Sequence, residues 1–147
     1  MRFLVQRVTQ ASITIAGEAG FSFQGPGYVV LCGVAPTDTI AQAEKLCAKL
    51  LKLRIFEDER GAMNRSLNDV NGALLFVSQF TLYADTASGN RPGFSTAARP
   101  EVAEPLYDFC CDKLRSTLGT RFGTGSFGAD MAIQLTNDGP CTFLLEA

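Results

Sequence analysis

The segment Val77–Leu82, with the sequence VSQFTL, places polar side chains inside an apolar run. In an extended strand, alternation would put Gln79 and Thr81 on one face and Ser78 and Phe80 on the other. A strand that ends near solvent explains this pattern equally well. The functional alternative is an anion pocket made of backbone N–H groups and a hydroxyl, which can stabilise the oxyanion of ester hydrolysis. Ser78, Gln79, Phe80 and Thr81 are therefore the candidate catalytic residues.

The absence of histidine restricts this chemistry. None of the 147 residues is His, which excludes a Ser-His-Asp triad, a Cys-His pair and the common zinc hydrolase sites. Catalysis would then depend on backbone dipoles, hydroxyls, carboxylates, Lys or Arg, or on a group that the substrate brings. The five cysteines form no C-x-x-C pair, so we expect reduced thiols in a cytosol-like compartment, with no metal and no cofactor.

A second unusual segment, Asp138-Gly139-Pro140-Cys141, lies close to the C-terminus. Proline is a poor first residue for a central strand because it cannot donate to the ladder. The simplest interpretation, and the one that the sequence alone favours, is a tight turn. The alternative uses the accessibility of a cis bond before proline: a cis bond at Gly139–Pro140 would align neighbouring carbonyl groups, which could then reject one substrate geometry.

The segment 123–128, GTGSFG, matches the dinucleotide-binding pattern G-x-G-x-x-G but has the wrong context. That fingerprint follows a strand and opens a helix, whereas here a predicted helix precedes the segment and a strand follows it. We expect a connector whose glycines approach another backbone closely. Phe127 could stack on a base, although packing in the core is the commoner role for a phenylalanine.

Two further features are candidates for contacts with a phosphate. The long polar loop 86–100 contains Arg91 next to a proline, and it predicts either a surface turn or the wall of a pocket. Lys45, Lys49 and Lys52 form a stripe on a predicted helix. We favour a solvated helix face over a phosphate-binding patch.

The elements that must position these residues alternate between strands and two helices. A helix capped by Asp38 or Thr39 should run to about Leu53, and a second one from about Pro100 to Leu118. About seven strands are expected, and their hairpins indicate an α+β fold with a largely antiparallel sheet or an open barrel. The predicted strands are 2–8, 11–15, 21–24, 28–34, 73–85, and a terminal hairpin of 131–135 and 141–145 around TNDGP.

Length and charge narrow the class of protein. A chain of 147 residues predicts one domain, 1–147. The net charge of −2 argues against a dedicated nucleic-acid coat protein, although it permits a local basic patch. No apolar run reaches 18 residues and the N-terminus does not resemble a signal peptide, so we expect no membrane partner.

Taken together, these segments resemble the D-aminoacyl-tRNA deacylases of the bacterial and eukaryotic type. The resemblance spans nearly the whole chain, and the SQFT and NDGP segments are its most specific parts. It also includes the segments MRFLVQRVTQASITI, LRIFED, GAMNRSL, GNRPGF, FGADM and CTFLLE. The family implies an α+β fold with a barrel-like sheet, a homodimer, and hydrolysis of the ester bond in D-aminoacyl-tRNA.

The resemblance also implies a role for each motif. Gly139-Pro140 would enter the partner subunit's pocket with a cis bond and screen the Cα of the aminoacyl group, which admits a D-residue or glycine. The Ser78–Thr81 segment would supply oxyanion donors, and the 2′-OH of the terminal adenosine of the tRNA would help to activate water. Phe127 and Met131 would hold the terminal adenine, and Arg7 is a further pocket candidate.

Three alternatives remain at this stage. One is a related deacylase with a trans bond at 139–140 and relaxed selectivity. Another is a non-enzymatic module that binds tRNA or DNA, and the third is a plain dimeric scaffold.

Overall fold

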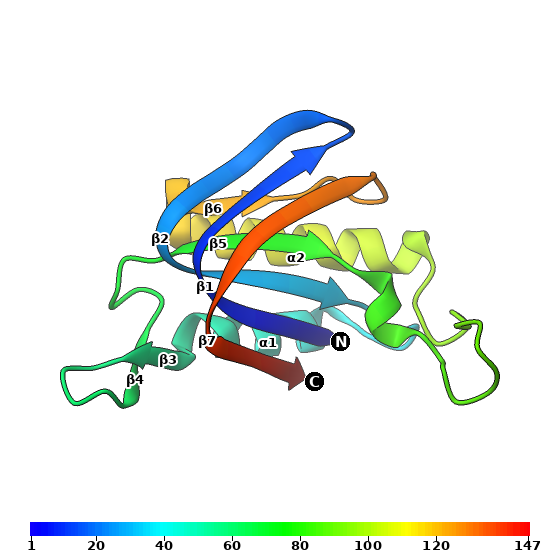
Figure 1. Ribbon diagram of the computed structural model, residues 1–147. Coiled ribbons are helices and arrows are strands. Elements are labelled where there is room, and N and C mark those ends of the chain that lie inside the picture. The colour runs from blue at the N-terminus through cyan, green and yellow to red at the C-terminus, as the bar shows by residue number, and fades with distance from the viewer.

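The computed structural model describes residues 1–147. The fold is α+β, as predicted, with two α-helices (Figure 1). In chain order the elements are β1 (Arg2–Ile15), β2 (Glu18–Gly33), α1 (Ile40–Lys52), β3 (Arg54–Glu57), β4 (Met63–Ser66), β5 (Ala73–Ser78), the 3₁₀ helix η1 (Phe80–Tyr83), α2 (Pro100–Leu118), the 3₁₀ helix η2 (Gly119–Arg121), β6 (Phe122–Thr124) and β7 (Met131–Glu146). Neither α-helix is long and apolar enough to cross a membrane.

The main sheet is mixed and open. Its strand order is β6-β5-β2-β1-β7, with antiparallel pairs at β1/β2 and β1/β7 and parallel pairs at β2/β5 and β5/β6. The barrel-like sheet that the resemblance implied is not closed into a barrel, because β6 and β7 do not pair. β6 pairs with β5 through only three residues, and the chain then leaves the sheet before β7 begins.

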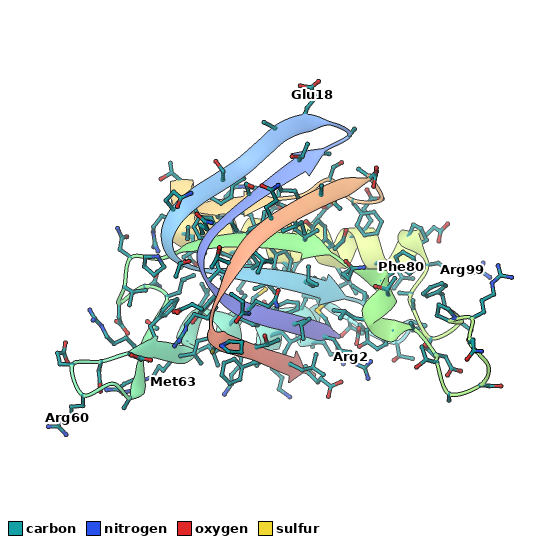
Figure 2. The ribbon with its side chains drawn as sticks, viewed as in Figure 1. Arg2, Glu18, Arg60, Met63, Phe80 and Arg99 are labelled. Atoms are coloured by element: carbon teal, nitrogen blue, oxygen red, sulfur yellow. The ribbon has the colours of Figure 1, made fainter.

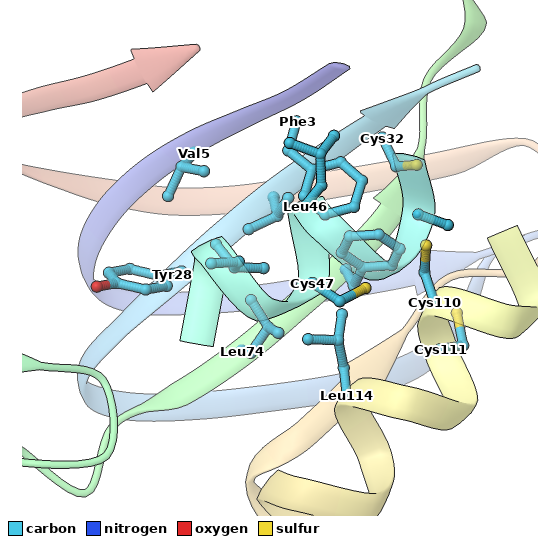
Figure 3. Close-up of a cluster of buried hydrophobic side chains, with 14 of the residues drawn as sticks. Phe3, Val5, Tyr28, Cys32, Leu46, Cys47, Leu74, Cys110, Cys111 and Leu114 are labelled. Atoms are coloured by element: carbon cyan, nitrogen blue, oxygen red, sulfur yellow. The ribbon is translucent and has the colours of Figure 1, made fainter. Parts of the chain in front are cut away.

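The helices pack on one face of this sheet and complete the main core. Leu46 and Cys47 of α1 and Cys110 and Leu114 of α2 point into one apolar cluster (Figure 3). Phe3, which is fully buried, reaches the same cluster from β1. Thr39 caps α1 through a capping box with Gln42, which confirms the predicted start. Gly119, with φ +57°, ends α2 as expected.

The far halves of β1, β2 and β7 bend away from the helices and curl over the other face of the sheet (Figure 1). There, Ala11 and Ile13 pack against Val29, Leu75 and Val77 in a second, smaller core. This second face thus carries packed strands where the first carries helices.

Three strands are longer than the sequence predicted, and the first is β1, which joins the predicted strands 2–8 and 11–15. The glycines and proline at 25–27 do not break β2, which continues through them with a register shift opposite β1 between Val8 and Gln10. The terminal hairpin is also wrong, because 131–135 and 141–145 belong to one strand, β7. Both halves pair antiparallel with β1, so the glycine and proline form a bulge within a strand and not a reversal of the chain.

The predicted strand 73–85 ends early. β5 stops at Ser78, and η1 begins at Phe80. Gln79 bends the chain with φ −148° and ψ 86°, and its carbonyl oxygen accepts from the Leu82 N–H at 3.3 Å. Strand alternation therefore does not apply to Gln79 and Thr81, which lie in and beside a helical turn.

Candidate active site

A cavity of about 600 Å³ opens at the carboxyl end of β5. A concave, mostly apolar cavity with a few polar groups is the usual form of a small-molecule site. It contains five of the residues that the sequence singled out, namely Ser78, Gln79, Phe80, Phe127 and Met131. The rest of the lining comes from the end of β2 and the residue after it, from β5, α2 and β7, and from the loops before α2 and β7: Cys32, Val34, Val77, Phe94, Ala97, Ala98, Arg99, Pro100, Ala103, Tyr107, Gly128, Ala129, Asp130 and Ile133.

The 3₁₀ helix η1 begins with two unpaired backbone amides, those of Phe80, which lines the cavity, and of Thr81, the next residue. The Gln79 N–H donates to the Cys32 carbonyl oxygen at 2.7 Å and so anchors the turn to β2. The next two amides, those of Phe80 and Thr81, have no acceptor within the chain. The first N–H groups of any helix lack intrahelical partners. Here the start of η1 therefore presents two adjacent donors beside the cavity, an arrangement suited to an oxyanion.

The Thr81 side chain has no base beside it. Its Oγ1 accepts from the Gln79 Nε2 at 2.6 Å, and Thr81 is exposed and does not line the cavity. The hydroxyl therefore lacks the partner that activates a threonine nucleophile. What the SQFT segment offers to a substrate is its main chain.

Two buried ionisable groups of the cavity lining, Cys32 and Tyr107, stay protonated at neutral pH. Burial raises the pKa of the Cys32 thiol and, as the largest cause, the pKa of the Tyr107 phenol. The Tyr107 hydroxyl donates to the Phe76 carbonyl oxygen at 3.0 Å, which fixes the ring. Neither group can take a proton from water, and the one carboxylate in the lining, that of Asp130, is exposed.

The connector between β6 and β7 supplies the apolar side of the cavity. The ring of Phe127 packs at a tilt against Tyr107, with 5.8 Å between centroids. Met131 lies so close to Gly125 that a Cβ on the glycine would meet its sulfur at 2.4 Å. The predicted close approach is thus made at Gly125 by side chains and not by another backbone, and Phe127 and Met131 both line the cavity.

A second cluster surrounds Gly139 and Pro140, away from this cavity. Val8 pairs with Asn137 and Gln6 pairs with Thr142, so the intervening residues of β7 bulge out opposite the single residue Arg7. The Gly139–Pro140 bond is cis. Both residues are exposed, and neither they nor Arg7 line the cavity.

Arg7 is buried beneath the bulge and holds it to a neighbouring hairpin. Its side chain is 5% exposed. Its Nε forms an ion pair with the Asp138 Oδ2 at 3.0 Å, and its Nη1 donates to the Ile55 carbonyl oxygen in β3 at 2.6 Å. The bulge therefore lies beside β3, whereas the cavity lies beside η1, at the opposite end of the molecule (Figure 1).

Asn137 closes the bulge, and the sequence reasoning missed it. The Cys141 N–H donates to its Oδ1 at 2.7 Å, and its Nδ2 donates to the Thr142 Oγ1 at 3.3 Å. A side-chain amide thus bridges the two ends of the Gly-Pro segment. An asparagine beside a turn segment was the available signal, because such residues often hydrogen-bond nearby backbone.

The loop 86–100 forms a wall of the cavity, as one of the two interpretations proposed. Phe94 and Arg99 line the cavity, whereas Arg91 is exposed and does not. Lys45, Lys49 and Lys52 are all exposed on α1 and line no cavity, in keeping with a solvated face. The sequence thus identified the loop but not the residues in it that reach the site.

Comparison with known proteins points to one family. The family described as D-Tyr-tRNA(Tyr) deacylase matches residues 4–146. A protein of Chlorobaculum parvum named D-aminoacyl-tRNA deacylase is 54% identical over 147 residues, which cover 100% of this chain and 98% of that protein. A protein of the same name from Limosilactobacillus reuteri is 54% identical over 146 residues, which cover 99% of each chain.

Solved structures share the fold over the whole chain. A protein titled c-Myc DNA Unwinding Element Binding Protein superposes with a TM-score of 0.92 and 41% identity, covering 100% of this chain and 99% of that one. A probable eukaryotic D-amino acid tRNA deacylase superposes with a TM-score of 0.85 at 18% identity, covering 99% and 98%, and it supports the fold alone.

Proposed function

This chain belongs to the D-Tyr-tRNA(Tyr) deacylase family, and we propose that its cavity holds the 3′ end of the substrate while the Phe80 and Thr81 amides bind the oxyanion. It is a D-aminoacyl-tRNA deacylase, a hydrolase that releases free tRNA and a D-amino acid. The observation that carries the mechanism is the pair of unpaired N–H groups at the start of η1.

Hydrolysis proceeds by attack of water on the ester carbonyl carbon. The carbonyl oxygen becomes the oxyanion, and the two amides stabilise it where its charge develops. Collapse of the intermediate breaks the bond to the ribose oxygen, which leaves with a proton. The chain has no histidine and the buried Cys32 and Tyr107 stay protonated, so we assign assistance of the water to the adjacent 2′-OH of the terminal adenosine.

Phe127 and Met131 bind the terminal adenine. Both are apolar residues in the cavity lining, and an aromatic ring and a thioether are good partners for the face of a base. The sulfur of Met131 lies against Gly125, and the ring of Phe127 packs against Tyr107, so each side chain has a neighbour that holds it.

Gly139 and Pro140 select the D-enantiomer from across a dimer interface. They are exposed and remote from the cavity of their own chain, which is the placement expected if they act in a partner's cavity. Their main chain would close the space beside the substrate Cα, which excludes an L-side chain. A D-residue fits, and so does the glycyl group of mischarged glycyl-tRNA.

A row of leucines supports self-association. Leu4 pairs directly with Leu31 on one side and with Leu144 on the other, so the three side chains share one face of the sheet. Their neighbour Phe3 points to the helices, so this row lies on the opposite face, where Leu144 is 49% exposed. Such a row is the type of surface that a second copy of the chain would cover.

Selectivity is tested by hydrolysis of D-Tyr-tRNA and L-Tyr-tRNA under identical conditions. We expect release of tyrosine from the D-form only. Equal cleavage of both substrates would reject the chiral filter, and cleavage of neither would reject the proposed catalytic site.

Action across the interface is tested by mixing two defective chains. Gly139→Ala disturbs the filter, because φ at this position is +129°, and Phe127→Ala disturbs the adenine site. In a mixed dimer, the Gly139→Ala chain would supply an intact cavity. The Phe127→Ala chain would supply the intact Gly139-Pro140 segment that enters this cavity. Recovery of D-selective hydrolysis on mixing supports action in trans, and no recovery from chains shown to exchange would contradict it.

A further inference from the structure

Two aromatic rings stand exposed at the rim of the cavity. Phe80 is 56% exposed and Phe94 is 41% exposed. The rings meet edge to face with 4.9 Å between centroids, and both belong to the cavity lining. In Figure 2, Phe80 and Arg99 lie at the same end of the molecule. Large apolar rings left in water beside a polar loop indicate a binding surface.

The main chain holds both rings in position. Phe80 follows directly on the hydrogen bond that anchors Gln79 to β2. Phe94 follows the isolated bridge between Asp85 and Gly93, whose N–H groups each donate to the other's carbonyl oxygen at 2.8 Å. The Ala98 N–H then donates to the Val34 carbonyl oxygen at 2.9 Å. The pair is therefore preorganised, although one ring lies on a loop.

A cation without a partner belongs to the same cavity lining as the rings. Arg99 lines the cavity and is exposed, and its guanidinium makes neither an ion pair nor a hydrogen bond within the chain, while its carbonyl oxygen accepts from the Val102 N–H. Aromatic rings that stack on bases, combined with basic groups that contact the backbone, are how proteins bind single-stranded nucleic acid.

We propose that Phe80 and Phe94 form a stacking platform for the nucleotide that precedes the terminal adenosine, and that Arg99 contacts the phosphate linking the two. This inference rests on the proposed function, because it extends the adenosine site by one nucleotide. The platform adjoins that site, since Phe80 and Phe127 line the same cavity. Stacking reads the face of a base, so the site would accept any base at this position.

The test compares substrates of increasing length. The D-tyrosyl esters of adenosine and of the dinucleotide cytidylyl-adenosine are hydrolysed by the wild type and by Phe94→Ala. We expect the ratio of kcat/KM for the dinucleotide ester to that for the adenosine ester to fall about tenfold to a hundredfold in the variant, mainly through KM. Phe94→Tyr, which keeps an aromatic face, should restore the ratio. Ile40→Ala removes a comparably exposed apolar side chain on α1, 54% exposed and outside the cavity, and serves as the control.

Each other outcome rejects the platform. An equal loss on both esters would mean that Phe94 acts on the adenosine site or on the fold. A changed sedimentation coefficient would mean that the rings contact a second copy of the chain. An unchanged ratio would mean that the second nucleotide does not touch them. The proposed function itself fails separately, if the wild type does not cleave the adenosine ester of D-tyrosine.

Discussion

At the scale of single residues, the proposed mechanism relies on main-chain groups where many hydrolases use side chains. The chain has no histidine, and the buried Cys32 and Tyr107 stay protonated. The Thr81 hydroxyl accepts a hydrogen bond from the Gln79 side chain and has no base beside it. The free donors are the Phe80 and Thr81 amides. Side-chain substitutions in this segment should consequently affect the rate less than changes to its backbone.

An amide-to-ester replacement at Thr81 tests this directly. It removes the N–H and keeps the side chain. We expect kcat for D-Tyr-tRNA to fall roughly 10²- to 10³-fold, the usual loss for one oxyanion donor, whereas Thr81→Ala should lose much less. The same replacement at Thr37, an exposed threonine outside the cavity, is the matched control. An equal loss at both positions would contradict the assignment.

Asn137 should determine stereoselectivity by holding the Gly-Pro bulge. Asn137→Ala leaves the Cys141 N–H without its acceptor, which we expect to destabilise the fold by about 1–3 kcal/mol. It should also raise hydrolysis of L-Tyr-tRNA relative to D-Tyr-tRNA. Asn137→Asp keeps an oxygen acceptor and should recover most of the selectivity. If selectivity were unaffected while stability fell, Asn137 would have a purely structural role.

At the scale of elements, close packing determines where the strands can lie. A Cβ on Gly123 in β6 would meet the Cγ of Phe21 at 1.9 Å. Gly123→Ala should therefore destabilise the protein by about 1–3 kcal/mol or more, as overpacking does, in a urea unfolding measurement. Gly93→Ala is the control, since its nearest neighbour would be 3.9 Å away, and a loss of similar size there would argue against a steric cause.

The turn between β3 and β4 should add an acid-sensitive contribution to stability. Hydrogen bonds from the Arg60 and Ala62 amides lower the pKa of the Asp58 carboxyl. A pKa depressed in the folded state stabilises the fold above the unfolded value of about 3.9, and this stabilisation disappears as the pH falls through the folded pKa. Asp58→Asn should therefore lose less stability than the wild type between pH 5 and pH 2. Glu59→Gln, adjacent and exposed, should behave like the wild type in the same urea titrations.

The sequence predicted the elements better than their ends. Periodicity and caps located both helices, because Thr39 and Gly119 act locally. Prediction from the sequence failed where tertiary pairing overrides a local signal. Glycine and proline at 139–140 predicted a chain reversal, but β1 pairs with residues on both sides of them. It failed again at Gln79, because an apolar run does not show where a strand turns into a 3₁₀ helix.

The candidate site was likewise predicted only in part from the sequence. SQFT and FGADM mark the cavity, and the structure brings them together. Arg7 was expected at the pocket, yet it lies under the bulge, since its distance from the cavity depends on how far the strands bend. Phe94 and Arg99 were missed because a polar loop carries no periodicity that shows which side chains turn inward.

At the scale of the whole molecule, activity should depend on association through the leucine row. Leu4→Arg places a charge between Leu31 and Leu144, and we expect a smaller species in sedimentation and a loss of D-Tyr-tRNA hydrolysis. Ala48→Arg, on the exposed side of α1, is the control and should change neither. A wild type that is monomeric at assay concentration, or a Leu4→Arg chain that stays fully active as a monomer, would refute the role of the row.

The distance between the bulge of β7 and the cavity has a practical consequence for protein engineering. The two regions share no lining residue and belong to opposite ends of the chain's own fold. Under the proposed function, codon libraries confined to 138–141 would vary the group that meets the substrate Cα and leave the residues that line the cavity of each chain unchanged. β1 would still pair with β7 on both sides of the randomised segment.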